Sequence, residues 1–215
     1  MLVLLPPAQA KPTDFLVHGF VSRVRERGLP VDIVLPNLDF NDALREQGTQ
    51  VLHNQVVGPA MASGYRAVWL AGISLGACHA LHYAAQCGSG LAGVVLLAPY
   101  PGTGDILREI EQAGGPQPWA DSLTTDVEHE RVWWRWLCAR ALRPAASPRI
   151  DFAAGRQDRF ARGQKLIAGL LPEEHVHWTD GGHDWPTWQR LWDHWLGRGL
   201  LRGDAPRSID RTQAL

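Results

Sequence analysis

The chain has 215 residues, of which 45% are hydrophobic and 20% are charged, and its formal net charge is -1. This length and composition fit one globular domain with a full hydrophobic core. The near-neutral charge, without long basic or acidic runs, argues against nucleic acid or an anionic membrane as a partner.

The cysteines and the apolar segments bear on the compartment. Cys78, Cys87 and Cys138 form no metal-binding or redox motif, and an odd number fits a reducing compartment better than a disulfide framework. The apolar start, MLVLLPP, lacks a charged segment and is short for a signal peptide, and no apolar stretch is long enough to span a bilayer. We therefore expect a cytoplasmic protein.

Six short apolar runs have little polar alternation, as in strands that are buried on both faces of a parallel sheet. They span residues 2–5, 31–35, 67–71, 93–98, 149–153 and 176–178. Segments with helical spacing lie between or after them, at 14–27, 42–62, 75–87, 104–113, 124–142, 159–170 and 186–197. This alternation predicts an α/β fold, with a mostly parallel sheet of about six strands and helices on both faces.

One connection breaks the regular alternation of the chain. Residues 101–148 separate the fourth and fifth apolar runs and are too long for a bare loop. Their two helical segments predict a small helical cap insertion over one end of the sheet, so the core comprises residues 1–100 and 149–200. Residues 201–215 are polar and include a proline, which predicts a flexible tail.

The strongest motif is Gly72-Ile73-Ser74-Leu75-Gly76, which lies between an apolar run and a helical segment. A serine in a strained turn from strand to helix has its hydroxyl lifted off the backbone, and small flanking residues let the two elements approach closely. The helix N-terminus adds a positive dipole near a developing oxyanion. The pattern predicts that Ser74 is a nucleophile, although the chain's 22 glycines could also produce it by chance.

A nucleophilic serine needs a base, and the base needs an acid that orients it. Gly181-Gly182-His183 follows the last apolar run, where flexible glycines let a loop bring the imidazole over the end of the sheet. His183 is therefore the predicted base. We expect structural or solvent-facing roles for His79, His82, His175, His177 and His194.

The predicted acid is Asp158, which follows the 149–153 run and should lie at the same sheet edge as the serine. Asp184 is adjacent to His183 and is badly placed to orient it. Asp180 lies on the same loop as the base, and Asp105, past the preceding run, is a rarer position for the acid.

The segments GISLGA, GRQD and GGHDW follow the third, fifth and sixth predicted strands in the order nucleophile, acid, base, which is that of the α/β hydrolases. Over residues 1–197 the chain resembles an α/β-hydrolase-fold serine hydrolase in a minimal form, and GGHDWPTWQRLWDHWL is similar to the end of carboxylesterase-type members. The resemblance implies acyl transfer to water without a metal or organic cofactor.

The run FLVHGF, at residues 15–20, looks like a strand that ends in the His-Gly of an oxyanion site. Only 17 residues separate His18 from the end of the next apolar run, which is too few for a full crossover helix, whereas Pro6 is 29 residues from it. We therefore place the first strand at residues 2–5, the oxyanion turn directly after it, and a helix at 14–27.

The expected oxyanion turn is Pro6-Pro7-Ala8, and prolines have no N–H group to donate. By position, the backbone N–H groups of Ala8 and Leu75 are the predicted oxyanion donors, and Gln9 is the fallback for Ala8. The loss of one donor costs about 3 kcal/mol of transition-state stabilisation.

The substrate is less defined than the chemistry. Trp133, Trp134 and Trp136 cannot all face one side of a helix; we favour an anchoring role for them over an apolar pocket. Trp185 and Trp188 could likewise pack the last helix or line the site.

We expect hydrolysis of a small-molecule ester or thioester. The alternatives are a weakly active or non-catalytic binding protein of the same fold, an acyltransferase, or a C–C bond hydrolase. In the family, one or two strands usually precede the strand that we place first. Without them we expect an exposed sheet edge, which a second copy could cover in a homodimer.

Overall fold

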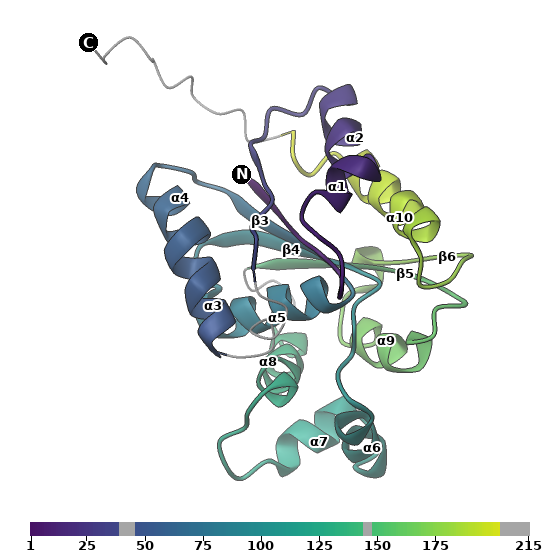
Figure 1. The fold of residues 1–215 in the computed structure, drawn as a ribbon. Helices are drawn as coiled ribbons and strands as arrows, with labels where there is room; N and C mark the ends of the chain where they lie inside the picture. The colour runs from purple at the N-terminus through teal and green to yellow at the C-terminus, as the bar shows by residue number, and fades with distance from the viewer. Residues whose placement is uncertain (39–45, 144–147, 203–215) are drawn as a thin grey trace.

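A computed structural model describes residues 1–38, 46–143 and 148–202, and they form one six-stranded sheet (Figure 1). All strands pair in parallel, in the order β2-β1-β3-β4-β5-β6. The strands are β1 (Leu2–Leu5), β2 (Ile33–Val34), β3 (Val68–Ile73), β4 (Leu91–Leu97), β5 (Arg149–Gly155) and β6 (Val176–Thr179). The predicted α/β fold with about six strands is confirmed.

Helices follow most of the strands. They are α1 (Asp14–Val17), α2 (Phe20–Glu26), α3 (Glu46–Leu52), α4 (Gly58–Ala62), α5 (Leu75–Cys87), α6 (Gly104–Gln112), α7 (Pro116–Ser122), α8 (Glu130–Ala141), α9 (Ala161–Ala168) and α10 (Trp185–Gly197). A π-helical turn, His53–Val57, joins α3 to α4, and a 3₁₀ turn, Glu173–His175, precedes β6. None of the helices in the described ranges is long and apolar enough to cross a membrane.

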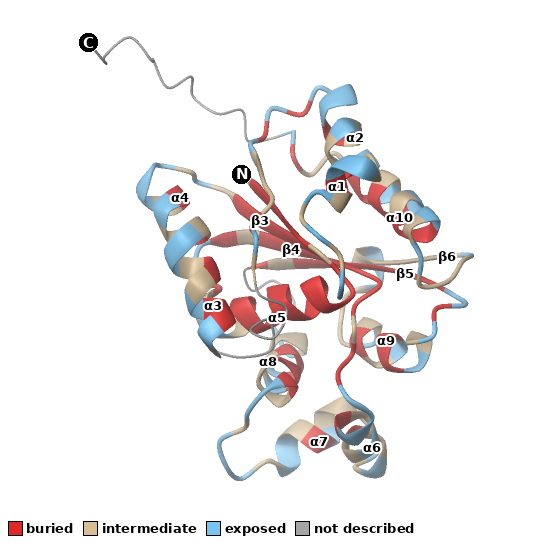
Figure 2. Cartoon of the chain, in the orientation of Figure 1, coloured by how far each residue is buried: buried red, intermediate tan, exposed pale blue. Residues whose placement is uncertain are grey.

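The sheet separates two hydrophobic cores, one on each face. Along β1, Val3 and Leu5 point into a core shared with α5 and α8, whereas Leu2 and Leu4 point into a core shared with α2 and α10. Successive strand residues face opposite sides, and all four residues of β1 are buried (Figure 2). Helices on both faces therefore explain why the strands read as unbroken apolar runs.

The strand order reverses direction between β1 and β3. From β1 the chain passes to β2 on one side and then returns to β3 on the other side. At such a reversal the loops leave the carboxyl ends of neighbouring strands in opposite directions, and sites in parallel sheets usually lie at this position. The turn that follows β3 contains Ser74.

The segment at 101–148 contains three described helices, so the expectation of two was wrong. The missed helix is α7; Pro116 and Pro118 look like breakers, but Pro116 lies in its first turn, where a missing N–H costs nothing. Helix α8 packs on α5, and Trp133 and Trp134 are fully buried in the core that covers the sheet. These two tryptophans anchor the segment, as we favoured. The division of the chain into a core and a cap insertion stays a prediction.

The expected tail begins inside the fold. Leu201 is 3% exposed and packs in the same core as α2 and α10, so the boundary at residue 201 is slightly early. Residues 203–215 lie outside the described residues.

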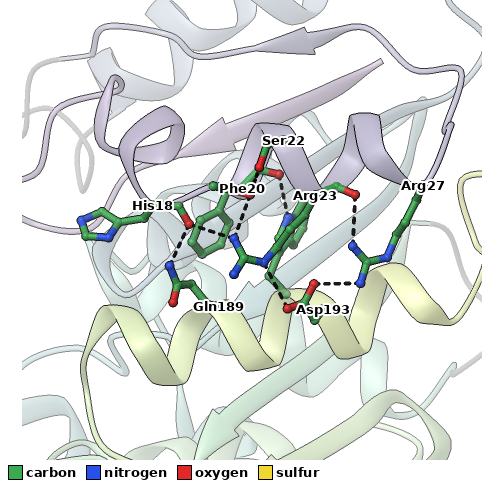
Figure 3. Close-up of polar contacts among 9 residues, drawn as sticks. His18, Phe20, Ser22, Arg23, Arg27, Gln189 and Asp193 are labelled. Carbon is green, nitrogen blue, oxygen red and sulfur yellow. Dashed lines mark hydrogen bonds and ion pairs between the residues drawn. The ribbon is translucent and has the colours of Figure 1, made fainter.

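The expected helix at 14–27 is two helices. The chain is helical there, as predicted, but it breaks at His18-Gly19, and Gly19 has a φ of 72°. The break frees the His18 carbonyl, which accepts hydrogen bonds from Arg23 Nη1 (3.1 Å) and Gln189 Nε2 (2.9 Å) (Figure 3). The sequence FLVHGF is thus part of a helical layer and lies outside the sheet.

Polar contacts hold α2 against α10. The Asp193 carboxylate accepts from Arg23 Nε at 3.1 Å and from Arg27 Nη2 at 2.8 Å (Figure 3). Trp192 donates its indole N–H to the Phe20 carbonyl at 3.0 Å. Because α10 directly follows the loop of His183, these contacts also fix where that loop ends.

We predict a pH-dependent stability that comes from His79, a buried residue of α5. Burial lowers the pKa of His79 from 6.5 to about 4. Its neutral form therefore stabilises the fold fully above pH 6.5, and this contribution is lost as the pH falls from 6.5 to 4. Between pH 7 and pH 5 the loss is about 2 kcal/mol of unfolding free energy.

Urea denaturation at these two pH values measures the effect. The His79→Leu variant should lose about 2 kcal/mol less than the wild type over this range. An equal pH dependence in wild type and His79→Leu would contradict the prediction.

Candidate active site

Ser74 occupies a strained turn between β3 and α5. Its φ is 52° and its ψ is -113°, a region that non-glycine residues rarely adopt. The Ser74 N–H donates to the Leu97 carbonyl, and the Ser74 carbonyl accepts from the Tyr100 N–H, both at 3.0 Å. The end of β4 thus holds the serine backbone on both sides.

The two glycines of the motif allow this turn because backbones approach each other there. A Cβ on Gly72 would lie 2.2 Å from the carbonyl of Gly76, and a Cβ on Gly76 would lie 2.1 Å from the Leu5 carbonyl oxygen. Neither backbone can move aside as a flexible side chain would. The spacing of the motif is therefore a steric requirement of this packing.

The structure brings Ser74, His183 and Asp158 together in series. His183 Nε2 lies 2.9 Å from Ser74 Oγ, and His183 Nδ1 lies 2.7 Å from Asp158 Oδ2. The Asp158 side chain is fully buried, and that of His183 is 7% exposed. A carboxylate can only accept, so Nδ1 carries the proton of the neutral ring and Nε2 accepts from the serine hydroxyl.

Hydrogen bonds join the loop of Asp158 to the loop of His183. The Gln157 N–H donates to the Gly181 carbonyl at 3.0 Å, and the Gly181 N–H donates to the Gln157 side chain at 2.5 Å. Asp158 Oδ1 also accepts from the Phe160 N–H at 2.8 Å, which leaves Oδ2 for the imidazole. The geometry of the pair is thus set by the loops.

Two aromatic rings flank the imidazole. The rings of Phe160 and Trp188 meet that of His183 edge-on, with centroid distances of 4.9 and 5.0 Å. Tyr100 packs on Phe160 at 5.3 Å. Sequence reasoning missed Phe160 and Tyr100; their positions, two residues after the acid and three after β4, were the available signal.

The three competing carboxylates lie elsewhere. Asp184 caps α10, where its carboxylate accepts from the Thr187 N–H at 2.9 Å, and this bond lowers the pKa of Asp184. Asp180 is exposed and lies 3.8 Å from Arg156. Asp105 pairs with Arg108 on the surface of α6.

The expected oxyanion turn lies beside the start of α5. The Pro6 carbonyl oxygen would be 2.6 Å from a Cβ on Gly76, so the turn is adjacent to α5. The Ala10 N–H donates to the Pro7 carbonyl at 3.2 Å, and Gln9 has a φ of 63°, as in a type II turn with Ala8 second and Gln9 third. Leu75 is the first residue of α5.

The other histidines make contacts away from this site. His177 and His194 stack on each other at 3.5 Å, and His82 Nδ1 lies 3.1 Å from the Thr49 hydroxyl. His18 stacks on Trp185 at 3.9 Å. Within the described ranges, no three histidine, cysteine or acidic side chains group as metal ligands would.

Comparison with known proteins places the fold. No family model and no curated protein matches the chain. Solved structures do match, among them the fluorophosphonate-binding serine hydrolase FphF of Staphylococcus aureus, which is 15% identical with a TM-score of 0.66 over 93% of this chain and 82% of that one. The S-formylglutathione hydrolase FrmB of S. aureus is 14% identical with a TM-score of 0.64 over 93% and 80%.

A third match has the fold named in its description. It is an α/β hydrolase from a lagoon-sediment metagenome, 17% identical with a TM-score of 0.58 over 94% of this chain and 91% of that one. The chain has the α/β-hydrolase fold. In this α/β-hydrolase fold the predicted nucleophile, acid and base follow β3, β5 and β6, and all three lie at the carboxyl edge of the sheet.

We predict that Gly72→Ala destabilises the α/β-hydrolase fold by about 3 kcal/mol or more, since the new Cβ meets backbone atoms that cannot give way. The control is Gly197→Ala at the end of α10, where a Cβ would meet nothing within 4 Å. Thermal unfolding monitored by circular dichroism compares the two. Equal melting temperatures would show that the close approach is not a constraint.

Proposed function

We propose that the chain is a serine hydrolase that cleaves a carboxylic ester or thioester through Ser74, His183 and Asp158 and an acyl-enzyme. The observation that supports this most is the series of two hydrogen bonds from Oγ through the imidazole to a buried carboxylate. The neighbours are serine hydrolases and esterases, which favours ester hydrolysis in general.

The reaction follows from the proton positions. Ser74 Oγ attacks the substrate carbonyl while His183 Nε2 takes its proton, and Asp158 stabilises the imidazolium that forms. The imidazolium then gives the proton to the leaving alcohol or thiol, and the acyl group stays on Ser74. Water repeats the sequence and releases the acid. No metal or organic cofactor enters these steps.

The tetrahedral oxyanion needs donors at the same edge. In this proposal the N–H groups of Leu75 and Ala8 supply them, because the turn after β1 and the start of α5 are adjacent. The α5 dipole adds positive potential at its N-terminus. The prolines at 6 and 7 hold the turn and leave the donation to Ala8.

Labelling with a fluorophosphonate probe tests the proposed nucleophile, and ester hydrolysis tests the proposed acid. Wild type should be labelled, and Ser74→Ala should not. Asp158→Asn should reduce the hydrolysis of p-nitrophenyl esters roughly 10⁴-fold, because an amide can present its NH₂ to the ring and favours the wrong tautomer.

Asp180→Asn is the matched control, since Asp180 is an exposed carboxylate on the loop of the base, and it should keep wild-type turnover. A folded wild type without labelling would favour the alternative, a non-catalytic binding protein of this fold. Equal losses in the two Asn variants would remove Asp158 from the proposed triad.

The oxyanion donor has its own test. Ala8 occupies the second position of its turn, which accommodates proline, so Ala8→Pro removes the N–H with little change of backbone. We expect kcat to fall about 100-fold while the melting temperature changes little. Ala8→Ser keeps the N–H and serves as the control. An Ala8→Pro enzyme with full kcat would assign the donor to another residue.

A further inference from the structure

An arginine next to the predicted acid stands close to the base. Arg159 lies on the loop from β5 to α9, and its guanidinium carbon is 4.9 Å from the centroid of the Phe160 ring. The same ring meets the His183 imidazole edge-on at 4.9 Å. The Arg159 guanidinium and the His183 imidazole therefore contact the same aromatic ring.

Arg159 differs from the other arginines of its segment. Arg156 lies 3.8 Å from the Asp180 carboxylate, and Arg162 pairs with Glu111. Among the described residues, no carboxylate lies within ion-pair distance of Arg159. Its side chain is exposed, so its charge is available at the surface next to the site.

The stacking on Phe160 prepares this side chain for a ligand. A guanidinium that lies over an aromatic ring is held in place while the N–H groups on its edge remain directed outward. A carboxylate fits two of those N–H groups at once, and this paired geometry is stronger than a contact to a point charge. A side chain held in advance also loses less entropy on binding.

The position of Arg159 near His183 indicates which part of a substrate reaches Arg159. The imidazolium gives its proton to the leaving group, so that group must pass over Nε2 on the imidazole side of Ser74. Phe160 packs against this imidazole and Arg159 stacks on Phe160, so the Arg159 charge lies near the group that gives the proton. We propose that Arg159 binds a carboxylate on the leaving alcohol or thiol of the substrate, an inference that rests on the proposed hydrolase function.

Two matched esters test this. In 4-acetoxybenzoate the leaving phenol carries a carboxylate, and in its methyl ester the same phenol is neutral. Arg159→Gln should lower kcat/KM about 10-fold for the anionic ester and change it less than twofold for the neutral one. Comparing each variant with wild type on the same ester cancels the difference in leaving-group reactivity. In 1 M NaCl the loss should shrink, because salt screens an exposed charge.

Arg156→Gln is the control, since it removes an exposed arginine from the same loop, and it should leave both esters unchanged. An equal loss of kcat/KM in Arg156→Gln would indicate a general electrostatic effect of positive charge near the site and would overturn the role of Arg159. A larger Arg159→Gln effect on monophenyl succinate, whose carboxylate is on the acyl side, would overturn the leaving-group assignment.

The remaining outcomes separate this inference from the proposed function. Equal effects of Arg159→Gln on the anionic and the neutral ester would overturn the role of Arg159 but not the hydrolase function. So would a wild type that a fluorophosphonate labels at Ser74 but that hydrolyses neither ester. A wild type with neither labelling nor hydrolysis would overturn the hydrolase function and this inference with it.

Discussion

The close approach of β3 and α5 is the constraint on which the rest of this structure depends. With a Cβ at Gly72 or Gly76 the strand and the helix could not meet, and the turn between them could not hold Ser74 at a φ of 52°. The turn presents the hydroxyl at the carboxyl edge of the sheet. Hydrogen bonds from the end of β4 then hold the strained backbone from both sides, so packing elsewhere offsets the cost of the strain.

The other parts of the site are brought to this edge by loops that bind one another. Gly181 exchanges hydrogen bonds with the backbone and the side chain of Gln157, so the loops of Asp158 and His183 are positioned as one unit. Farther away, Asp193 and Trp192 hold α10 against α2, which fixes the end of the loop that contains His183. The positions of the three side chains thus depend largely on hydrogen bonds made by neighbouring residues of the loops and helices.

Where the sequence predictions were wrong, local signals competed with packing. The segment at 116–122 looks like a turn because of its prolines, yet a helix begins there because a proline in the first turn lacks only an unneeded donor. The segment at 14–27 has helical spacing throughout, yet it breaks at Gly19, where the His18 carbonyl is used by Arg23 and Gln189. These partners lie 5 and 171 residues from His18 along the chain. The periodicity of apolar residues carries no information about such contacts.

The sequence by itself determined a mostly parallel sheet of about six strands and the three residues that follow strand ends, because buried strands must be apolar and a strained serine turn requires glycines at fixed spacing. Only the tertiary structure decided that Trp133 and Trp134 belong to the core, that Asp184 caps a helix, and that Phe160 contacts both His183 and Arg159. The physical reason is that strand propensity and turn chemistry act between near neighbours. The partner of a single side chain depends on how loops from distant parts of the chain meet.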